Sequence, residues 1–122
     1  YPVLLFCMRV NSFFLKQSKK HGVGVFILHN VRKGTRLNVF AGSERLIYRK
    51  LKKSSCDFFL KRYCIKVDTN TYSSPVSFVR MSIGWYMNHS KRPNVIHKNY
   101  VFYAKKNIQK GKELTIDYST LE

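Results

Sequence analysis

The sequence lacks the features that mark several large classes of protein. Its 122 residues contain 3 cysteines and no Cys-x-x-Cys pair, which argues against a disulfide framework and against a structural zinc site. No run reaches the about 18 apolar residues of a membrane-spanning helix. Residues 2–10 also lack the basic start and the cleavage site of a signal peptide. We therefore expect no metal site and no membrane segment. A nuclear or other reducing intracellular compartment is the simplest location.

Acidic residues are scarce as well, because 6 Asp and Glu stand against 23 Lys and Arg and give a net charge of +17. Such a surface attracts phosphate backbones or acidic protein faces, although a solubilising bias would explain it equally well. The basic residues recur in short groups and not in one tail. These groups are KKH at 19–21, RKLKK at 49–53, KR at 61–62 and 91–92, and KK at 105–106. They indicate a folded domain with a basic surface that offers contact to nucleic acid.

Hydrophobic residues make up 44% of the chain, which is enough for a core in a single domain over residues 1–122. Because the chain starts at Tyr1 and not at Met, an excised fragment is one interpretation.

Short β-prone runs dominate the sequence. We expect one or two strands in the first fifteen residues, a polar break at 16–20, and strands at 25–28, 63–67, 99–104 and 114–118, with a turn at 68–70. Residues 43–53 place Leu46, Ile47 and Leu51 among charges and form the best candidate for a helix. A short helix is predicted over 75–87. The sum is a mainly β domain with short helices.

One pattern occurs twice. NVRKGTRL at 30–37 is echoed by NIQKGKEL at 107–114, and in both a strand ends, a Lys-Gly turn follows and a new strand begins. Glycine suits the positive φ that such turns often need. The repetition predicts two similar hairpin-like corners in one fold.

Three short motifs could carry chemistry, and each is ambiguous alone. Gly22-Val23-Gly24 lets a ligand approach the backbone but is more often a plain turn, and it is no dinucleotide fingerprint because a strand follows. NHSKRPNV at 88–95 shows no nucleophile motif around its serine and no second metal ligand near His89. By itself it reads as a structural turn. ELTIDY at 113–118 reads by itself as an edge strand that ends in Tyr118.

In this order and spacing, the motifs resemble the SET domain, the fold of most protein lysine methyltransferases. NHSKRPNV matches the family signature NHS-x-x-PN, GKELTIDY matches GEELTxDY, and GVGVF looks like the GxGxF opening. Tyr63 in YCIKVD lies where the family has Tyr-x-Phe-x-Ile-Asp. The resemblance covers residues 22–118. It implies a β-clip fold of small sheets with a C-terminal pseudoknot that brings the three motifs together.

The resemblance also implies an activity and a site. Family members transfer a methyl group from S-adenosylmethionine to a lysine ε-amine and release S-adenosylhomocysteine. The implied catalytic residues are Tyr118, the channel tyrosine, and Tyr63. The implied cofactor contacts are the backbone of Gly22, Val23 and Gly24, together with Tyr63, Trp85, Asn88, His89 and Tyr118.

Several positions depart from the family pattern. Phe40 stands where a second channel tyrosine is usual, Trp85 where an arginine is common, and Ile116 where a larger aromatic residue often tunes the number of methyl groups. Lys91 follows Ser90 where many members have a cysteine, and no cysteine cluster follows Tyr118. The zinc-binding segment that closes the lysine channel in many members is therefore expected to be replaced by another segment, a partner chain or the substrate.

The leading hypothesis is a protein lysine methyltransferase, with a histone or nucleosome as the favoured substrate. Two alternatives remain. One is a catalytically weak SET domain that binds its cofactor or chromatin, and the other is a basic nucleic-acid-binding β domain.

Overall fold

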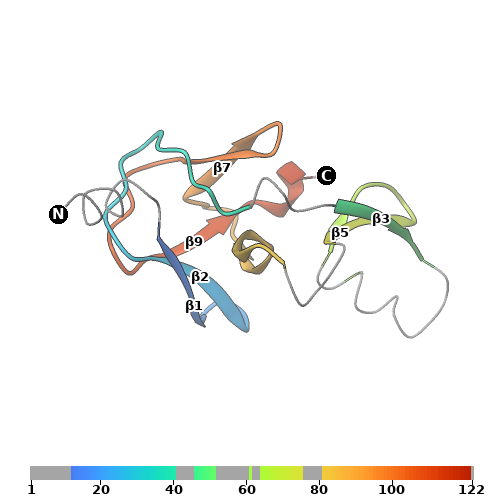
Figure 1. Cartoon of the computed structure of the whole chain (residues 1–122), viewed down its shortest axis with the longest axis horizontal. Coiled ribbons are helices and arrows are strands. Elements are labelled where there is room, and N and C mark those ends of the chain that lie inside the picture. Colours follow the sequence, from blue (N-terminus) through green and yellow to red (C-terminus); the bar gives the residue numbers. More distant parts are fainter. Residues whose placement is uncertain (1–11, 41–45, 52–60, 62–63, 76–80, 122) are drawn as a thin grey trace.

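The computed structural model describes residues 12–40, 46–51, 61, 64–75 and 81–121 (Figure 1). Its elements, in chain order, are β1 (Phe13–Gln17), β2 (Val23–Ile27), β3 (Leu46–Lys50), β4 (Ile65–Lys66), β5 (Thr71–Pro75), the 3-10 helix η1 (Ile83–Tyr86), β6 (Asn88–His89), β7 (Val95–Lys98), β8 (Val101–Ala104), β9 (Glu113–Ile116) and the 3-10 helix η2 (Tyr118–Leu121). The predicted fold class, mainly β with short helices, is confirmed.

The strands form three small sheets in the orders β1-β2-β9-β6, β3-β5-β4 and β7-β8. Strand β9 lies inside its sheet, antiparallel to β2 and parallel to β6. The edge-strand interpretation of this segment is therefore wrong. Because β6 is close to β9 in space but far from it in sequence, the C-terminal segment passes beside Asn88 and His89, as the predicted pseudoknot requires.

The helix predicted over 43–53 is wrong, since residues 46–50 form β3 and pair with β5 along their whole length. Ile47 and Tyr48 are β-prone residue types, and pairing with a neighbouring strand outweighs a weak helical period. Among the described residues of the helix predicted over 75–87, Ile83–Tyr86 are helical, and Pro75 ends β5. Residues 1–11 and 76–80 lie outside the described part. The predicted polar break begins within β1, which runs to Gln17.

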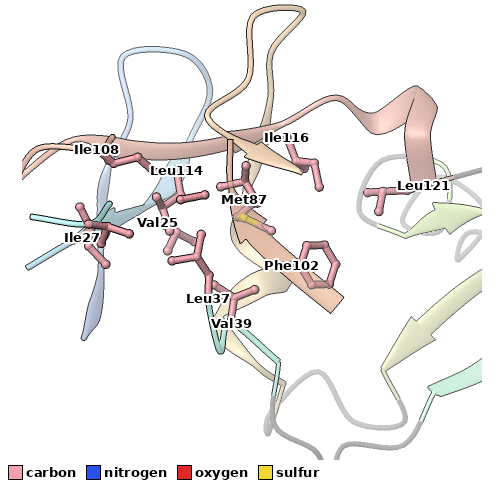
Figure 2. Packing of buried hydrophobic residues seen from close by; sticks show 13 residues of the cluster. Val25, Ile27, Leu37, Val39, Met87, Phe102, Ile108, Leu114, Ile116 and Leu121 are labelled. Atoms are coloured by element: carbon pink, nitrogen blue, oxygen red, sulfur yellow. The ribbon is translucent and has the colours of Figure 1, made fainter. Parts of the chain in front are cut away.

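One hydrophobic cluster joins the four-stranded sheet to the β7-β8 hairpin (Figure 2). Its buried members come from β2, β7, β8, β9, η2 and the segments that connect the elements: Val25, Ile27, Val31, Leu37, Val39, Met87, Val95, Phe102, Ala104, Ile108, Leu114, Ile116 and Leu121. Residues of β2 on both faces are buried, as is expected of a strand covered on both sides. The segments that carry the three motifs are therefore anchored in a common core.

The two corners of the repeated pattern hold each other. Val31 and Ile108 exchange N–H···O bonds of 2.8 Å in both directions and form an antiparallel bridge. Gly34 and Gly111 have φ of 87° and 86°, which is the left-handed region that glycine enters without strain. The prediction of two similar corners is confirmed, and the structure adds that they interlock.

The β7-β8 hairpin holds the C-terminal helix η2. Its turn uses Asn99 and Tyr100 with φ of 50° and 62°, the conformation of a type I′ turn. The Tyr100 hydroxyl donates to the Leu121 carbonyl at 2.9 Å, and the His97 Nε2 lies 2.7 Å from the Thr120 carbonyl. These contacts position η2, which begins at Tyr118.

Candidate active site

The turn that opens β2 presents its backbone to solvent on one side and to a carboxylate on the other. Gly22 is exposed with φ of 49°, and no atom lies within 4 Å of the place where a side chain would begin. At Gly24 a Cβ atom would overlap the carboxylate of Glu113, a residue of β9. Glycine is therefore needed at the two positions for different reasons: Gly22 adopts a left-handed backbone, and Gly24 leaves room for the close approach of Glu113.

The Asn88 side chain ties this turn to β9. Its Nδ2 group donates to Glu113 Oε2 at 2.8 Å, to the His21 carbonyl at 2.9 Å and to the Val23 carbonyl at 3.3 Å. The Ser18 hydroxyl lies 2.7 and 2.9 Å from the two Glu113 carboxylate oxygens and completes the network. Asn88 is buried, so its donors need these partners to offset the loss of water. The network fixes the carbonyls of His21 and Val23.

Glu113 is the site residue that sequence reasoning missed. The sequence predicts a strand for its segment and no role for this acid. A signal existed, because Glu113 occupies the position in the second corner that Arg36 occupies in the first. A cation, Arg36, thus stands in the first copy of the repeat where an anion, Glu113, stands in the second.

Tyr118 lies at the junction of β9 and β6. Its hydroxyl donates to the Met87 carbonyl at 2.5 Å, and its backbone N–H donates to His89 Nδ1 at 3.1 Å. Burial, and then the nearby Glu113 carboxylate, raise the pKa of the Tyr118 hydroxyl above its ordinary value. The hydroxyl therefore stays protonated at neutral pH and acts as a hydrogen-bond group, not as a base.

His89 serves as an acceptor in this arrangement. Its Nδ1 accepts the backbone N–H of Tyr118. Asp117 Oδ1 lies 3.8 Å from the same Nδ1. The rings of His89 and Tyr118 lie 5.2 Å apart. His89 thus positions the backbone of Tyr118.

The remainder of the 88–95 motif is structural. The Asn94 side chain behaves like a strand residue toward β9: its Nδ2 donates to the Glu113 carbonyl at 2.8 Å, and its Oδ1 accepts the Thr115 N–H at 2.9 Å. The Ser90 hydroxyl accepts the Arg92 N–H at 3.1 Å, which closes a turn. Ser90 is therefore part of that turn.

Phe40 and Trp85 form an aromatic cluster beside the core. The Phe40 ring lies against Gly84, where a side chain would overlap it, and its centroid is 5.7 Å from Trp85 and 5.1 Å from Phe102. Phe40 thus occupies its position as a packing residue. Trp85 meets this cluster from η1, two residues before the Met87 carbonyl that receives Tyr118.

The structure brings Gly22, Val23, Gly24, Asn88, His89 and Tyr118 together through the contacts above. Tyr63 lies outside the described residues, so its predicted role stays a prediction. Ile116 is fully buried in the core, and Lys91 is exposed. Among the residues that the structure describes, no group of three His, Cys, Asp or Glu could hold a metal ion, and no helix is long and apolar enough to cross a bilayer.

Comparisons with known proteins agree with this geometry. The family model of the SET domain matches residues 22–119. One similar solved structure is a protein of Plasmodium falciparum assigned as a histone methyltransferase, with a TM-score of 0.55, 24% identity, and coverage of 87% of this chain and 91% of that chain. Another is KRYPTONITE in complex with mCHH DNA, an H3(1-15) peptide and SAH, with a TM-score of 0.60, 21% identity, and coverage of 88% of this chain and 23% of that one. No curated protein matches significantly. Since the matched residues include all three motifs and the contacts that join them, the chain belongs to the SET-domain family.

Proposed function

We propose that this SET domain transfers a methyl group from S-adenosylmethionine to the ε-amine of a protein lysine, with a histone as the favoured substrate. One observation carries the proposal: the Tyr118 hydroxyl, held on the Met87 carbonyl, shares a site with the glycine turn that Asn88 and Glu113 anchor. Support for a histone comes from the solved structures of similar fold, one assigned as a histone methyltransferase and one bound to an H3 peptide.

The residues present fit a cationic methyl donor. When bound, S-adenosylmethionine supplies an electrophilic methyl group on a positively charged sulfur, whose departure as a neutral thioether needs no acid. The open backbone at Gly22 lets a ligand approach closely. The fixed carbonyls of His21 and Val23 and the Glu113 carboxylate favour positive charge nearby. These groups would hold the donor.

Tyr118 positions the amine that accepts the methyl group. Its proton is engaged by the Met87 carbonyl, so its oxygen lone pairs remain to accept an N–H from the substrate lysine. The lysine must be neutral to attack, and its ordinary pKa is about 10.4, which entry into a desolvated channel lowers. Alignment of a neutral amine for in-line attack is therefore the contribution that this side chain makes.

Phe40 makes Tyr118 more important in this chain. Phe40 packs against Gly84 and Phe102. Since phenylalanine has no hydroxyl, this chain lacks the hydroxyl of the second tyrosine that the family usually has at this position. A substitution of Tyr118 by phenylalanine would therefore leave this chain without either of the two tyrosine hydroxyls that the family usually has in its channel. The same feature motivates the alternative, a catalytically weak domain that binds its cofactor or chromatin.

The test is transfer of labelled methyl from S-adenosylmethionine to nucleosomes, free histones and other basic proteins, with mass spectrometry to locate the modified lysine. We expect Tyr118→Phe to lower kcat by about 10²-fold, because the amine loses its alignment, while calorimetry shows that S-adenosylhomocysteine still binds. Tyr48→Phe is the matched control, since Tyr48 lies on β3 with 70% of its surface exposed.

Two results would contradict the proposal. Binding of S-adenosylhomocysteine without transfer to any substrate would favour the weak binding module. Absence of both binding and transfer would exclude cofactor-dependent methylation by this domain.

A further inference from the structure

The two interlocked corners gather basic side chains into one surface. We define the corner surface as the seven exposed cations that these corners carry: Arg32, Lys33, Arg36, Lys105, Lys106, Lys110 and Lys112. Residues 30–37 and 104–112 contain no Asp or Glu. The corner surface thus holds 7 of the 23 cations in 17 of the 122 residues.

The topology, and not sequence proximity, places the two halves side by side. The Lys33 N–H donates to Asn107 Oδ1 and the Lys110 N–H donates to Asn30 Oδ1, both at 2.8 Å, so each corner crosses to the other. In Figure 1 both corners lie at one end of the molecule, away from η2, where Tyr118 begins. The backbone segments that carry the corner surface are therefore apart from η2 in this view.

The charge of the corner surface is not neutralised from within. The acid closest in sequence is Glu113, whose carboxylate is bonded to Ser18 and Asn88 in the site. Within the part of the chain that the structure describes, none of the seven cations belongs to an ion pair. Seven like charges on a fixed backbone repel one another and attract a polyanion.

We propose that the corner surface docks the chain onto the phosphate backbone of duplex DNA. The apolar residues of the corners, Val31, Leu37, Ala104 and Ile108, are all buried. The surface therefore offers charge without the apolar centre that a protein partner needs. Phosphate contacts require only such cations and no base reading, which also suits a set dominated by lysine.

Other nucleic acids fit less well. Single strands are held by aromatic stacking, and residues 30–37 and 104–112 contain no aromatic residue. Duplex RNA is recognised largely through its 2′-hydroxyls, whereas the corner surface consists of cations, whose partner is the phosphate group. The corner surface therefore favours duplex DNA and predicts binding without sequence preference.

Fluorescence anisotropy with a labelled mixed-sequence DNA duplex, measured across a range of KCl concentrations, tests the proposal. The corner variant carries Lys33→Gln, Lys105→Gln, Lys106→Gln and Lys110→Gln. The control variant carries Lys50→Gln, Lys61→Gln, Lys66→Gln and Lys98→Gln, which are exposed cations outside the corners. Both variants lose four charges. We expect the corner variant to weaken binding at least about tenfold and to lower the salt slope by about 3 to 4, and the control to do neither.

A measurement on the unchanged chain guards against misfolding of the variants. Acylation of lysines with and without bound DNA, read by mass spectrometry, should show protection of the corner lysines and not of Lys50, Lys61, Lys66 and Lys98. Equal losses in both variants, equal protection everywhere, or tighter binding of duplex RNA, single strands or an acidic peptide would each overturn the proposal.

The result is separable from the proposed methyl transfer. The corner variant should methylate a free histone peptide as well as the unchanged chain does, because none of its four substituted side chains takes part in the contacts of the candidate site. Failure of methyl transfer with intact, corner-dependent DNA binding would remove the function and leave this inference standing.

Discussion

The two corners of the fold share a backbone and differ in what they present. The Gly34 N–H donates to the Ala104 carbonyl and the Gly111 N–H to the Ile27 carbonyl, both at 2.8 Å. Thr35 and Lys112 close their turns onto the residues three before them, both at 3.1 Å. Each donor in one corner has its counterpart in the other. The repeated residues therefore account for the architecture and not for the site.

The difference appears where each corner ends. Leu37 and Leu114 take equivalent places and are both buried, but the residues before them are Arg36 and Glu113. Arg36 is exposed and belongs to the corner surface, whereas Glu113 turns into the network of Ser18 and Asn88. At this one position, therefore, the first corner carries an exposed cation and the second carries an anion that belongs to the candidate site.

The largest expected effect comes from removing this contrast. Glu113→Ala leaves the Ser18 hydroxyl and one Asn88 donor without their charged acceptor, which should lower the free energy of unfolding by about 2–3 kcal/mol. It should also abolish measurable binding of S-adenosylhomocysteine, because the glycine turn loses its anchor. Arg36→Ala, at the equivalent exposed position, should change the free energy of unfolding by less than about 0.5 kcal/mol. Urea unfolding and calorimetry measure both, and equal effects would contradict the assignment of Glu113 to the site.

Gly34 and Gly111 occupy equivalent positions in the two corners and allow the corners to be compared by the same substitution. Gly34→Ala and Gly111→Ala should each cost about 1–2 kcal/mol, because both require a positive φ and neither has an atom within 4 Å of the added Cβ. The stability losses should match. Only Gly111→Ala should also weaken S-adenosylhomocysteine binding, since it precedes Glu113 by two residues. A loss of binding from Gly34→Ala at equal stability would speak against this division of roles.

The sequence predicts the features of this structure that depend on local residue patterns, and it misses those that depend on contacts between distant segments. The repeat predicted both corners and the order of the motifs predicted the family, because glycines at turns and short motifs leave a local trace in the sequence. That the motifs meet in space was implied by the family resemblance alone. The helix predicted over 43–53 failed because its pairing with β5 is a long-range contact that a local period does not contain. Glu113 was missed for a related reason, since its partners Ser18 and Asn88 lie 95 and 25 residues away.

The reciprocal asparagines should have smaller effects. Asn30→Ala and Asn107→Ala each remove a side-chain acceptor for one exposed backbone N–H, at Lys110 and Lys33, and should each cost about 0.5–1 kcal/mol. Because the two bonds cross the same junction, the double variant should cost less than the sum of the single variants. Thermal unfolding of the four proteins in this cycle measures the coupling. Additive losses would show that the two corners are held independently.

The smallest effect concerns alkaline pH and Tyr118, which lies two residues after the end of β9. Since the pKa of Tyr118 is raised in the folded state, its contribution to stability is fully present below the unfolded value of about 10 and is lost as pH rises through the folded value. The free energy of unfolding should therefore fall more steeply above about pH 10 for the unchanged chain than for Tyr118→Phe. Burial is the larger cause of the raised pKa and Glu113 the smaller, so Glu113→Ala should show an intermediate slope. The first corner carries Ala41 at the equivalent position, which has no titrating group, so this alkaline slope belongs to the second corner alone. Identical slopes in the unchanged chain and in Tyr118→Phe would mean that the half-buried Tyr118 hydroxyl is not the group that couples this site to pH.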